Sequence, residues 1–466
     1  MRVAVVTENF LPKVDGVTRT LTRLLEHLQL TGHQVILFGP ESGLATYAGA
    51  KLYGTAGIPF LPYPELKLNT WRPEFTRRLK EFDPHVIHIV DPVYLGAALL
   101  LVCRIQKMNI PIVASYHTNL ATYCIQFGWG IFSGLMWAWN RYCHSKCAYT
   151  VCPSPSTMQI LHQQGFQNLR IWPRGVDTQL FSPEKRSPAL RSAWMTGSST
   201  EISAEEKTIL LYVGRVSFEK NLNLVLDAYK TMDHTVCHLV IVGHGPALEQ
   251  IKRESQSSQL PLTFTGHLQG EDLAAAYASS DVFAFPSFTE TFGQVVLESM
   301  ASGLSVVGLF AEGVKDLVED QKTGLLLDVT EDMPRNVQID KYKALLNQLV
   351  DDSDLRIKMK KNAVAASKKY SWWDAMERMV DVYKEAVSNN TQDDITSEEC
   401  TALESVIIDQ LDETIGDISS TEEENDFTDS SSEGSGGLAK TKITEHELPF
   451  QHPLQQTNTI RRIQNI

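Results

Sequence analysis

The chain has 466 residues, enough for two domains of ordinary size. Its formal net charge of −14 is concentrated in residues 390–466, which hold 17 acidic and 4 basic side chains, so the rest is nearly neutral. A nearly neutral body argues against a nucleic-acid-binding protein, which would carry a basic surface. The seven cysteines are irregularly spaced and lack the paired C-x2-C pattern of zinc sites, so we expect reduced thiols and no metal.

The first residues read as a core strand that starts at residue 2. Residues 1–8 are too short and too soon charged for a signal peptide, and no apolar run reaches the roughly 20 residues of a membrane span. We therefore expect a cytoplasmic protein, with peripheral attachment to the cytosolic face of a membrane as an option.

Short β-branched runs alternate with helical patterns through the first 175 residues. In chain order we predict strand 3–6, helix 18–30, strand 34–38, strand 85–90, helix 95–106, strand 111–115, helix 133–146, strand 149–152, a helix from 156 and strand 169–172. Such alternation predicts a parallel sheet covered on both faces, with ligands beyond the carboxyl ends of its strands.

A second alternation follows a break. Residues 174–182 and the polar stretch 187–206 interrupt the pattern and predict an interdomain connection. The second set of predicted strands is 209–213, 238–242, 262–265, 282–285, 304–307 and 324–327, with helices between them and three more helical patterns to about residue 388. From residue 390 onward Asp, Glu, Ser and Thr dominate, and such a segment cannot bury enough apolar surface to fold alone.

Two carboxylates lie within the strand–loop–helix–strand pattern of residues 281–307. Glu290 lies in the loop, the helical pattern begins at Phe292, and Glu298 lies inside the helix. A helix N-terminus attracts anions, but carboxylates beside a phosphate would repel it. We therefore expect the two acids to bind hydroxyl groups of a sugar attached to that phosphate. For either glutamate alone, a solvated helix residue is the simpler interpretation.

Two cations follow the first strand of the second half. Arg215 and Lys220 would flank the end of strand 209–213 and the start of the next helix, a placement that suits a diphosphate. A surface pair between Arg215 and Glu219 is an equal alternative when the motif is taken in isolation.

Two further loops follow strands of the first half. Gly16 lies at a helix start, where a backbone can approach a phosphate closely, although glycine is common there. His117 follows strand 111–115 and could hydrogen-bond a substrate or shuttle a proton. A lone histidine is more often structural, so neither residue decides the function by itself.

Together these motifs resemble the GT-B glycosyltransferases of family 4. The matching parts are Gly16, Tyr116-His117-Thr118, Gly214-Arg215 with Lys220, and Glu290 to Glu298 with Phe292-Gly293 between them. The resemblance covers residues 1–388 and points to glycolipid-forming members, such as sulfoquinovosyltransferases acting on diacylglycerol and GDP-mannose-dependent α-mannosyltransferases. It implies two Rossmann-like, doubly wound parallel-sheet domains that face a cleft.

We accordingly predict four segments. These are an acceptor domain at 1–178, a nucleotide-sugar donor domain at 179–370, a helix at 371–389 that crosses back to the first domain, and a disordered acidic tail at 390–466. The tail is available to bind other proteins, whereas a solvating role alone is the simpler interpretation.

The resemblance also implies a reaction and its residues. The reaction is retaining, metal-independent transfer of a hexosyl group from a UDP- or GDP-linked sugar, without a cofactor, and we take the acceptor to be a lipid such as diacylglycerol or a glycolipid at a membrane surface. By matching positions, the implied catalytic residues are His117, Glu290, Arg215 and Lys220. The implied donor-binding residues are Gly16, Arg215, Lys220, His267, Leu268, Glu290, Thr291, Phe292, Gly293 and Glu298.

Each implied residue has an expected contact. Arg215 and Lys220 would hold the diphosphate, Glu298 the ribose, Glu290 the sugar hydroxyls, and His117 the sugar near the reacting carbon. The base would lie against residues 265–268. Two departures weaken the match, since the first loop has one glycine where the family often has two, and His244 replaces an acid.

The acceptor side gives a weaker signal. Residues 125–140 carry no charge and hold five aromatic side chains, Phe127, Trp129, Phe132, Trp137 and Trp139. As a helix they fit a membrane interface, an apolar acceptor pocket or a buried position between sheet and domain. Alternative functions are a glycosyltransferase with a soluble acceptor, a nucleotide-sugar epimerase on the same fold, and an inactive nucleotide-sugar-binding scaffold. The intact set of predicted catalytic residues argues against the scaffold.

Overall fold

The computed structural model describes residues 1–12, 15–60, 63–119, 121, 130–195, 206–330 and 332–390. The predicted acidic tail therefore lies outside the described residues, apart from Asn390, and so do residues 125–129 of the charge-free stretch. Within the described ranges, no helix is both long and apolar enough to cross a membrane.

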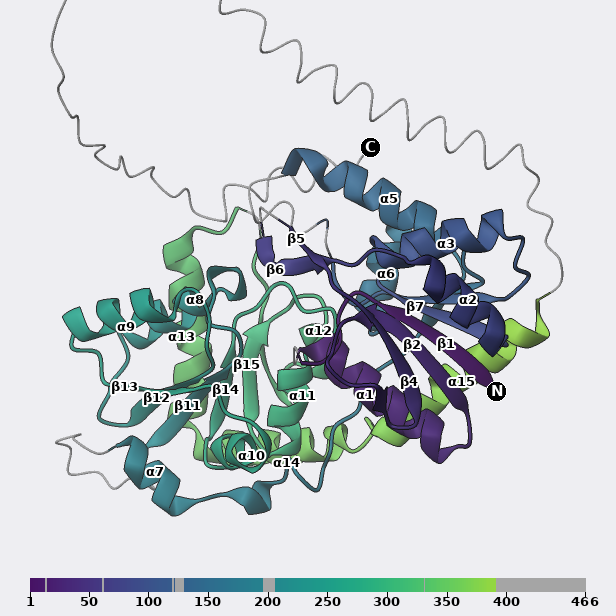
Figure 1. The fold of residues 1–466 in the computed structure, drawn as a ribbon. Coiled ribbons are helices and arrows are strands. Elements are labelled where there is room, and N and C mark those ends of the chain that lie inside the picture. Colours follow the sequence, from purple (N-terminus) through teal and green to yellow (C-terminus); the bar gives the residue numbers. More distant parts are fainter. Residues whose placement is uncertain are drawn as a thin grey trace, which may run out of the picture. The chain divides into compact units, whose positions relative to one another are not determined.

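The first half of the chain forms an eight-stranded sheet (Figure 1). Its order is β10-β9-β8-β7-β1-β2-β4-β3, and neighbouring strands are parallel except for β3, which runs antiparallel to β4. The strands are β1 (Arg2–Thr7), β2 (Gln34–Pro40), β3 (Thr46–Tyr47), β4 (Ala50–Thr55), β7 (Val86–Val90), β8 (Ile112–Ser115), β9 (Tyr149–Cys152) and β10 (Leu169–Ile171). A separate antiparallel pair consists of β5 (Ile58–Phe60) and β6 (Tyr63–Leu68).

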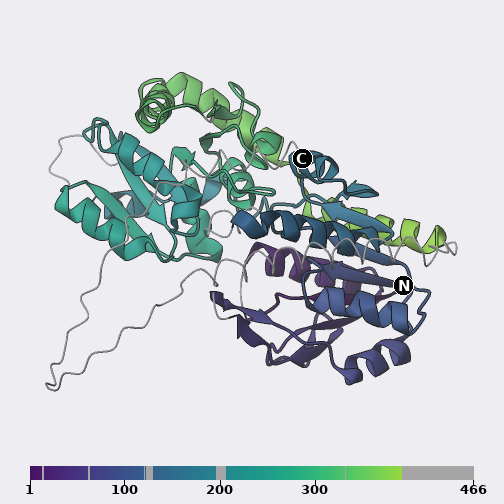
Figure 2. The ribbon, with the colours of Figure 1, turned by 90° about the horizontal axis from the view of Figure 1, so that it is seen from above.

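Helices cover both faces of this sheet because its strands are apolar on both faces (Figure 2). Val3 and Val5 pack with α1 (Gly16–Leu30) and α15 (Trp372–Ser388), whereas Ala4 and Val6 pack with α2 (Pro73–Phe82) and α3 (Leu95–Ile105). The other helical segments that the structure describes in this half are η1 (Gly130–Phe132), α5 (Ser133–Ser145) and α6 (Pro155–Gln163).

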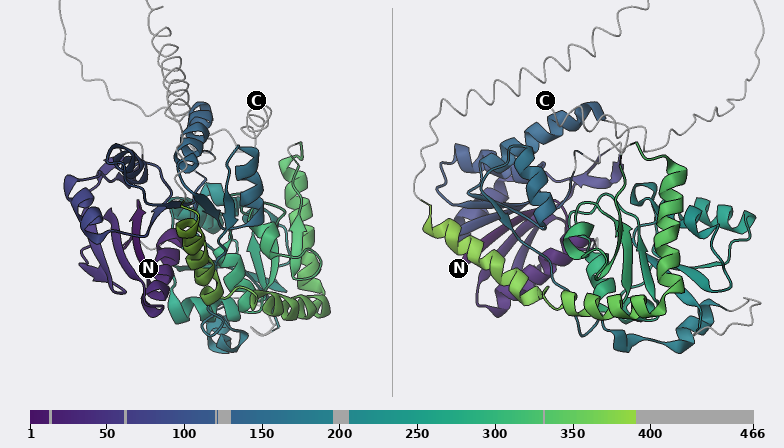
Figure 3. Two further views of the ribbon diagram at one scale, coloured as in Figure 1. Left: turned by 90° about the vertical axis from the view of Figure 1, so that its right-hand side faces the viewer. Right: turned by 180° about the vertical axis from the view of Figure 1, so that it is seen from behind.

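The last helix of the described residues, α15, packs on the first sheet although it follows the second half in the chain (Figure 3). Its buried residues Met376, Met379, Val380 and Tyr383 belong to the same core as β1 and α1. This packing ties the C-terminal end of the described chain to the first half.

The second half forms a six-stranded parallel sheet in the order β13-β12-β11-β14-β15-β16. Its strands are β11 (Thr208–Val213), β12 (Cys237–Val242), β13 (Leu262–Gly266), β14 (Val282–Phe285), β15 (Ser305–Leu309) and β16 (Gly324–Leu327). Its helical segments are η2 (Pro183–Lys185), α7 (Pro188–Trp194), η3 (Phe218–Lys220), α8 (Leu222–Tyr229), α9 (Leu248–Ser257), α10 (Gly270–Ala278), α11 (Gln294–Ala301), α12 (Val314–Leu317), α13 (Arg335–Asp351) and α14 (Ser353–Ser367). Nearly every strand residue is buried except in the edge strand β13, whose five residues are half-buried, as expected for a sheet covered on both faces.

Three details differ from the sequence prediction. Residues 46–82 hold β3 to β6 and α2, none of which the periodicity indicated. The polar connection contains α7, whose Arg191 and Trp194 are buried. Helix α11 begins at Gln294 rather than Phe292, because Gly293 at its N-cap has a left-handed backbone with φ of 92°.

Candidate functional site

The strand order of the second sheet reverses between β11 and β14. In doubly wound sheets, ligands bind beyond the carboxyl ends of the strands at such a reversal. The loops that follow these two strands hold Arg215, Lys220 and Glu290. The first sheet reverses between β1 and β7, and the loops that follow those strands hold Glu8 and Asp91.

Glycines allow two loops to pack backbone against backbone beside β11. A Cβ atom on Gly243, whose φ is 144°, would lie 1.9 Å from the carbonyl oxygen of Gly214. A Cβ atom on Gly245 would lie 2.3 Å from the carbonyl oxygen of Val216. The loop of residues 243–245 therefore packs directly on the backbone of the Arg215 loop. The Arg215 residue itself is exposed.

Lys220 and Glu290 form an ion pair that joins the two loops. The distance from Lys220 Nζ to Glu290 Oε1 is 2.5 Å, and the two side chains are only 16 % and 18 % exposed. Ser287 Oγ donates to the same carboxylate oxygen at 3.2 Å. Asn221 Nδ2 donates to the carbonyl oxygen of Pro286 at 3.2 Å, which adds a second link between the loops.

Glu298 is almost completely buried inside α11, with 1 % exposure. Its Oε1 accepts a hydrogen bond from Arg19 Nη1 at 2.6 Å, and its Oε2 accepts from the Tyr277 hydroxyl at 3.3 Å. Burial raises the pKa of Glu298, and the positive charge of Arg19 opposes that shift. Arg19 and Tyr277 were missed at the sequence level, although a carboxylate on a buried helix face implies that some cation must reach it.

Gly16 is the first residue of α1. Asp15 caps this helix, since the backbone N–H of Thr18 donates to Asp15 Oδ1 at 2.9 Å. A Cβ atom on Gly16 would meet nothing within 4 Å, so the backbone there faces open space. Arg19 follows one turn later on the same helix and reaches Glu298 of the second half.

The other predicted donor-binding residues lie near the two loops or on strand ends. Thr291 Oγ1 donates to the carbonyl oxygen of His117 at 3.0 Å, and Phe292 is buried. His267 is exposed, with its Nε2 2.7 Å from Gln269 Nε2, and Leu268 packs against the core of the second half. His267 and Leu268 follow β13, two strands away from the reversal.

Both ring nitrogens and the backbone N–H of His117 have hydrogen-bond partners inside the protein. Its ring Nδ1 accepts a hydrogen bond from Arg174 Nη2 at 2.9 Å, and its Nε2 lies 2.8 Å from Ser115 Oγ. Its backbone N–H donates to Asp91 Oδ1 at 2.7 Å. Burial and the charge of Arg174 lower the pKa of His117 well below its ordinary value. The ring is therefore neutral, and both of its nitrogens have partners inside the protein.

A second contact between the halves lies at the start of α6. Ser156 Oγ donates to Asp316 and also accepts from the backbone N–H of Gly313 at 3.0 Å. Thr157 Oγ1 lies 3.0 Å from the carbonyl oxygen of Thr291 and 2.6 Å from Glu312 Oε1. One threonine hydrogen cannot serve both acceptors, so a protonated Glu312 would satisfy the two contacts together.

Stability should therefore depend on pH through Glu312. Burial raises the pKa of Glu312 from 4.5 to about 7, and nearby Asp316 adds to that shift. Between these values the folded chain binds a proton that the unfolded chain has released, so the free energy of unfolding falls as pH rises toward 7. We expect Glu312→Gln to raise the melting temperature relative to wild type more at pH 8 than at pH 5.5.

Thermal melts of both proteins at the two pH values check this. The exposed Glu249, replaced by glutamine, serves as the matched control and should change the melting temperature equally at both values. An equal effect of Glu312→Gln at pH 5.5 and pH 8 would show that this carboxyl does not titrate between these pH values in the folded chain, which would contradict the prediction.

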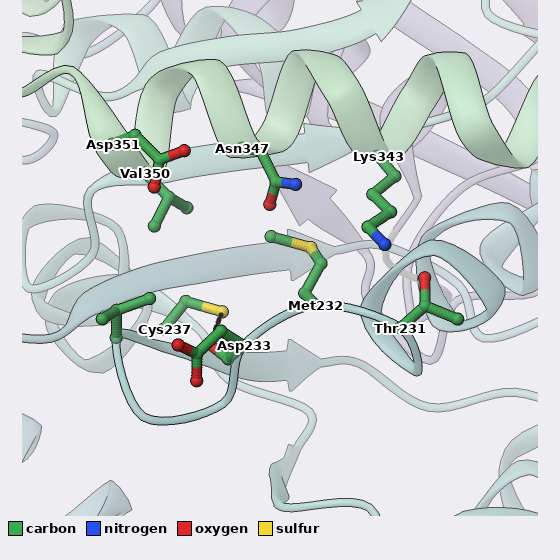
Figure 4. Close-up of a pocket in the computed structure, with 9 residues that line it drawn as sticks. Thr231, Met232, Asp233, Cys237, Lys343, Asn347, Val350 and Asp351 are labelled. Atoms are coloured by element: carbon green, nitrogen blue, oxygen red, sulfur yellow. Dashed lines mark hydrogen bonds between the residues drawn. The ribbon is translucent and has the colours of Figure 1, made fainter.

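A cavity of about 290 Å³ lies away from the predicted residues. Figure 4 shows the residues that line it. Lys343, Asn347 and Asp351 of α13 line one side of it, and Thr231 and Cys237 line the other. Cys237 begins β12, so the cavity lies at the amino ends of the strands, opposite the edge where ligands bind. In the described part of the chain, no group of three or more His, Cys, Asp or Glu side chains is arranged to hold a metal ion.

Comparison with known families gives two matches. The profile of Glycosyltransferase Family 4 matches residues 14–180, and the profile of Glycosyl transferases group 1 matches residues 199–365. The first range covers the first sheet without β1, the second range covers the second sheet, and together they contain the predicted residues of both halves.

Curated relatives cover most of the described chain. A GDP-mannose-dependent alpha-mannosyltransferase of Mycolicibacterium smegmatis is 38 % identical over 338 residues, which are 71 % of this chain and 85 % of that protein. The sulfoquinovosyl transferase SQD2 of Arabidopsis thaliana is 31 % identical over 369 residues, or 77 % of this chain and 68 % of the relative. An alpha-monoglucosyldiacylglycerol synthase of Streptococcus pneumoniae is 26 % identical over 70 % of this chain and 75 % of its own length.

Solved structures share the fold at lower identity. Sucrose-phosphate synthase from Thermosynechococcus elongatus aligns with a TM-score of 0.66 and 18 % identity over 83 % of this chain and 99 % of that one. Anabaena HepE in complex with UDP aligns with a TM-score of 0.64 and 18 % identity over 83 % of this chain and all of its own.

Proposed function

Because the chain belongs to glycosyltransferase family 4 and has the GT-B fold, we propose that it transfers a hexosyl group from UDP- or GDP-linked sugar to a lipid acceptor. We further propose that the transfer retains the anomeric configuration and requires no metal ion. One observation carries the assignment of the donor site. Lys220 and Glu290, from the two loops at the strand-order reversal, meet there with little exposure to solvent.

The cations of this site suit the leaving group. Cleavage of a glycosyl–phosphate bond builds negative charge on the diphosphate, and fixed cations that face this charge stabilise it. We assign that role to Arg215 and Lys220, Arg as a planar fork and Lys as a point charge. The N-terminus of α1, where Asp15 caps the Thr18 N–H and the backbone at Gly16 faces open space, adds its other N–H groups and a positive dipole end.

The two glutamates suit hydroxyl groups. An ionised carboxylate accepts up to about four hydrogen bonds. Arg19, Tyr277 and the longer contact from Gln294 at 3.5 Å therefore leave Glu298 with remaining acceptor capacity for a ribose. Glu290 already accepts from Lys220 and Ser287, which fixes its orientation toward a sugar held beside the diphosphate. Fixed acceptors of this kind lose little entropy when the substrate binds.

We propose that His117 contacts the transferred sugar and does not transfer a proton. Its neutral ring has both nitrogens engaged, and its backbone is fixed by Asp91 and Thr291. A general base would need a free lone pair within reach of the proton that it removes. We therefore assign His117 to contact with the transferred sugar, and we name no covalent nucleophile.

The names of the relatives and one exposed surface support a lipid acceptor. The pneumococcal relative is named for a glucosyldiacylglycerol product. On the chain itself, Tyr94, Leu101 and Ile105 at α3 are 45 %, 56 % and 65 % exposed, although all three are apolar or aromatic. Such side chains are suited to peripheral contact with a membrane surface.

A donor screen tests the proposal. The protein is incubated with radiolabelled UDP- and GDP-sugars, with diacylglycerol-containing vesicles or with soluble sugar acceptors, in the presence and absence of a chelator. We expect label in the lipid extract with one donor, unchanged by the chelator. Label only in soluble products would refute the lipid acceptor, and conversion of the donor sugar without any acceptor would indicate an epimerase.

A further inference from the structure

A row of buried polar side chains connects His117 to helix α15. Ser115 Oγ lies 2.8 Å from His117 Nε2 and 2.8 Å from His88 Nε2. The hydroxyl of Tyr383 lies 2.7 Å from His88 Nδ1. Ser115, His88 and Tyr383 are at most 1 % exposed, so solvent cannot replace any partner in this row.

The direction of hydrogen bonding is fixed at the His117 end. A guanidinium group only donates, so Arg174 requires an unprotonated Nδ1 on His117. The neutral ring then carries its hydrogen on Nε2, which donates to Ser115 Oγ. From Ser115 to Tyr383, the heavy-atom positions permit either order of donors and acceptors.

An aromatic neighbour, Trp172, keeps the two rings in place. Trp172 packs edge-on to His88 and to His117, with ring centroids 5.6 and 5.7 Å away. Its indole N–H donates to the carbonyl oxygen of Ala375 in α15 at 3.1 Å. Helix α15 therefore contacts the histidine pair through both Tyr383 and the ring that packs on it.

A continuous buried row differs from isolated polar pairs because each bond orients the next group. Hydrogen bonds in a low-dielectric interior polarise one another, so loss of one member is felt by the others. A buried polar group that loses its partner also bears the full desolvation cost, which favours reorientation. Removing the Tyr383 hydroxyl should thus act on Ser115 and His117 as well as on His88.

We propose that Ser115, His88 and Tyr383 are positioning residues for His117, through which the seating of α15 sets the geometry of the site for the transferred sugar. This inference rests on the proposed function, in which His117 contacts that sugar. It assigns to α15 a role beyond closing the core of the first half.

Tyr383→Phe and Ser115→Ala test the proposal on the full chain. Each should lower kcat by about fivefold to tenfold with little change in the KM of the donor, the size expected for one buried hydrogen bond. In a double-mutant cycle, the combined variant should be no slower than Ser115→Ala alone, because both changes break the same row. Independent, multiplying losses would overturn the proposal.

Tyr149→Phe is the matched control. The Tyr149 hydroxyl also bonds α15, through Glu385 at 2.8 Å, but it does not enter the row. A loss of kcat in Tyr149→Phe equal to that in Tyr383→Phe would show that both changes act by loosening α15 and not through the row, which would overturn the proposal. We expect Tyr149→Phe to retain wild-type kcat within about twofold.

Ring nitrogen spectra supply a readout that does not need the enzymatic reaction. The ¹⁵N signals of His117 should show the Nε2–H tautomer in wild type and should shift in Tyr383→Phe but not in Tyr149→Phe. Unchanged His117 signals in Tyr383→Phe would overturn the proposal. If no donor supports transfer, the proposed function fails, yet these spectra still decide whether the row couples Tyr383 to His117.

Discussion

Replacing Lys220 with alanine is expected to lower kcat/KM for glycosyl transfer by about 10²- to 10³-fold, the usual cost of removing one group that stabilises transition-state charge. Lys220 is the partly buried cation of the strand-order reversal, with its Nζ 2.5 Å from Glu290. Its loss leaves Glu290 without its cation and the leaving diphosphate without a fixed charge. Initial rates across donor concentrations measure the effect.

Lys230→Ala is the matched control for this prediction. Lys230 lies in the same half of the chain, pairs with Asp227 on the helix surface and is 41 % exposed. Its replacement should leave kcat/KM unchanged within about twofold, since exposed pairs contribute little. Turnover of Lys220→Ala at the wild-type rate would exclude Lys220 from the reaction.

Replacing Arg191 with alanine is expected to destabilise the protein by about 3–5 kcal/mol, the usual cost of breaking a buried ion pair from one side. Arg191 is fully buried and donates to Asp281 at 2.8 Å and to two backbone carbonyl oxygens at 2.6 and 2.7 Å. Burial favours the neutral form of Asp281, but Lys360 and Arg191 outweigh it and lower the pKa of that carboxyl. Urea denaturation measures the change in the free energy of unfolding.

Arg253→Ala separates the buried contacts from a general loss of charge. Arg253 is exposed on α9, in the same half of the chain. Its replacement should change the free energy of unfolding by no more than about 0.5 kcal/mol. A cost of Arg191→Ala close to that of Arg253→Ala would mean that the remaining partners of Asp281 carry the network.

The arrangement of the second half follows from local sequence patterns. Apolar runs that end at Val213 and Phe285 predicted the two strands, and their carboxyl ends define where a ligand binds in a parallel sheet. Arg215, Lys220 and Glu290 then stand out because they are charged and follow those runs directly. The family resemblance gave the same positions, and the family itself is confirmed by the profile matches.

Local sequence patterns could not predict contacts between residues that lie far apart in the sequence. Arg19 meets Glu298 only because α1 and α11 come together in the fold, and periodicity carries no information on that pairing. The same holds for His117, whose ring partner Arg174 depends on the path of the chain after β10. The strands at 46–68 were missed because they hold no uninterrupted apolar run, since Gly54, Pro59 and Pro64 fall inside them.

The roles assigned to the individual residues stay predictions. In particular, the ring of His117 was predicted with proton transfer as one option, and its two internal partners now argue for contact without transfer. Glu290 and Glu298 keep their assignments to sugar and ribose hydroxyls. Lys220 is paired to Glu290 rather than standing alone as a diphosphate ligand, which connects the two parts of the donor site.

Calorimetric titration of the full chain with GDP and with UDP tests the central claim most directly, because it needs neither the right sugar nor the acceptor. We predict saturable binding of one of the two nucleotides at one site per chain. The dissociation constant should rise at least about tenfold in Lys220→Ala, through loss of a charge-assisted contact, and stay at the wild-type value in Lys230→Ala. Binding of neither nucleotide, or equal affinity in wild type and Lys220→Ala, would contradict a donor site at the ends of β11 and β14.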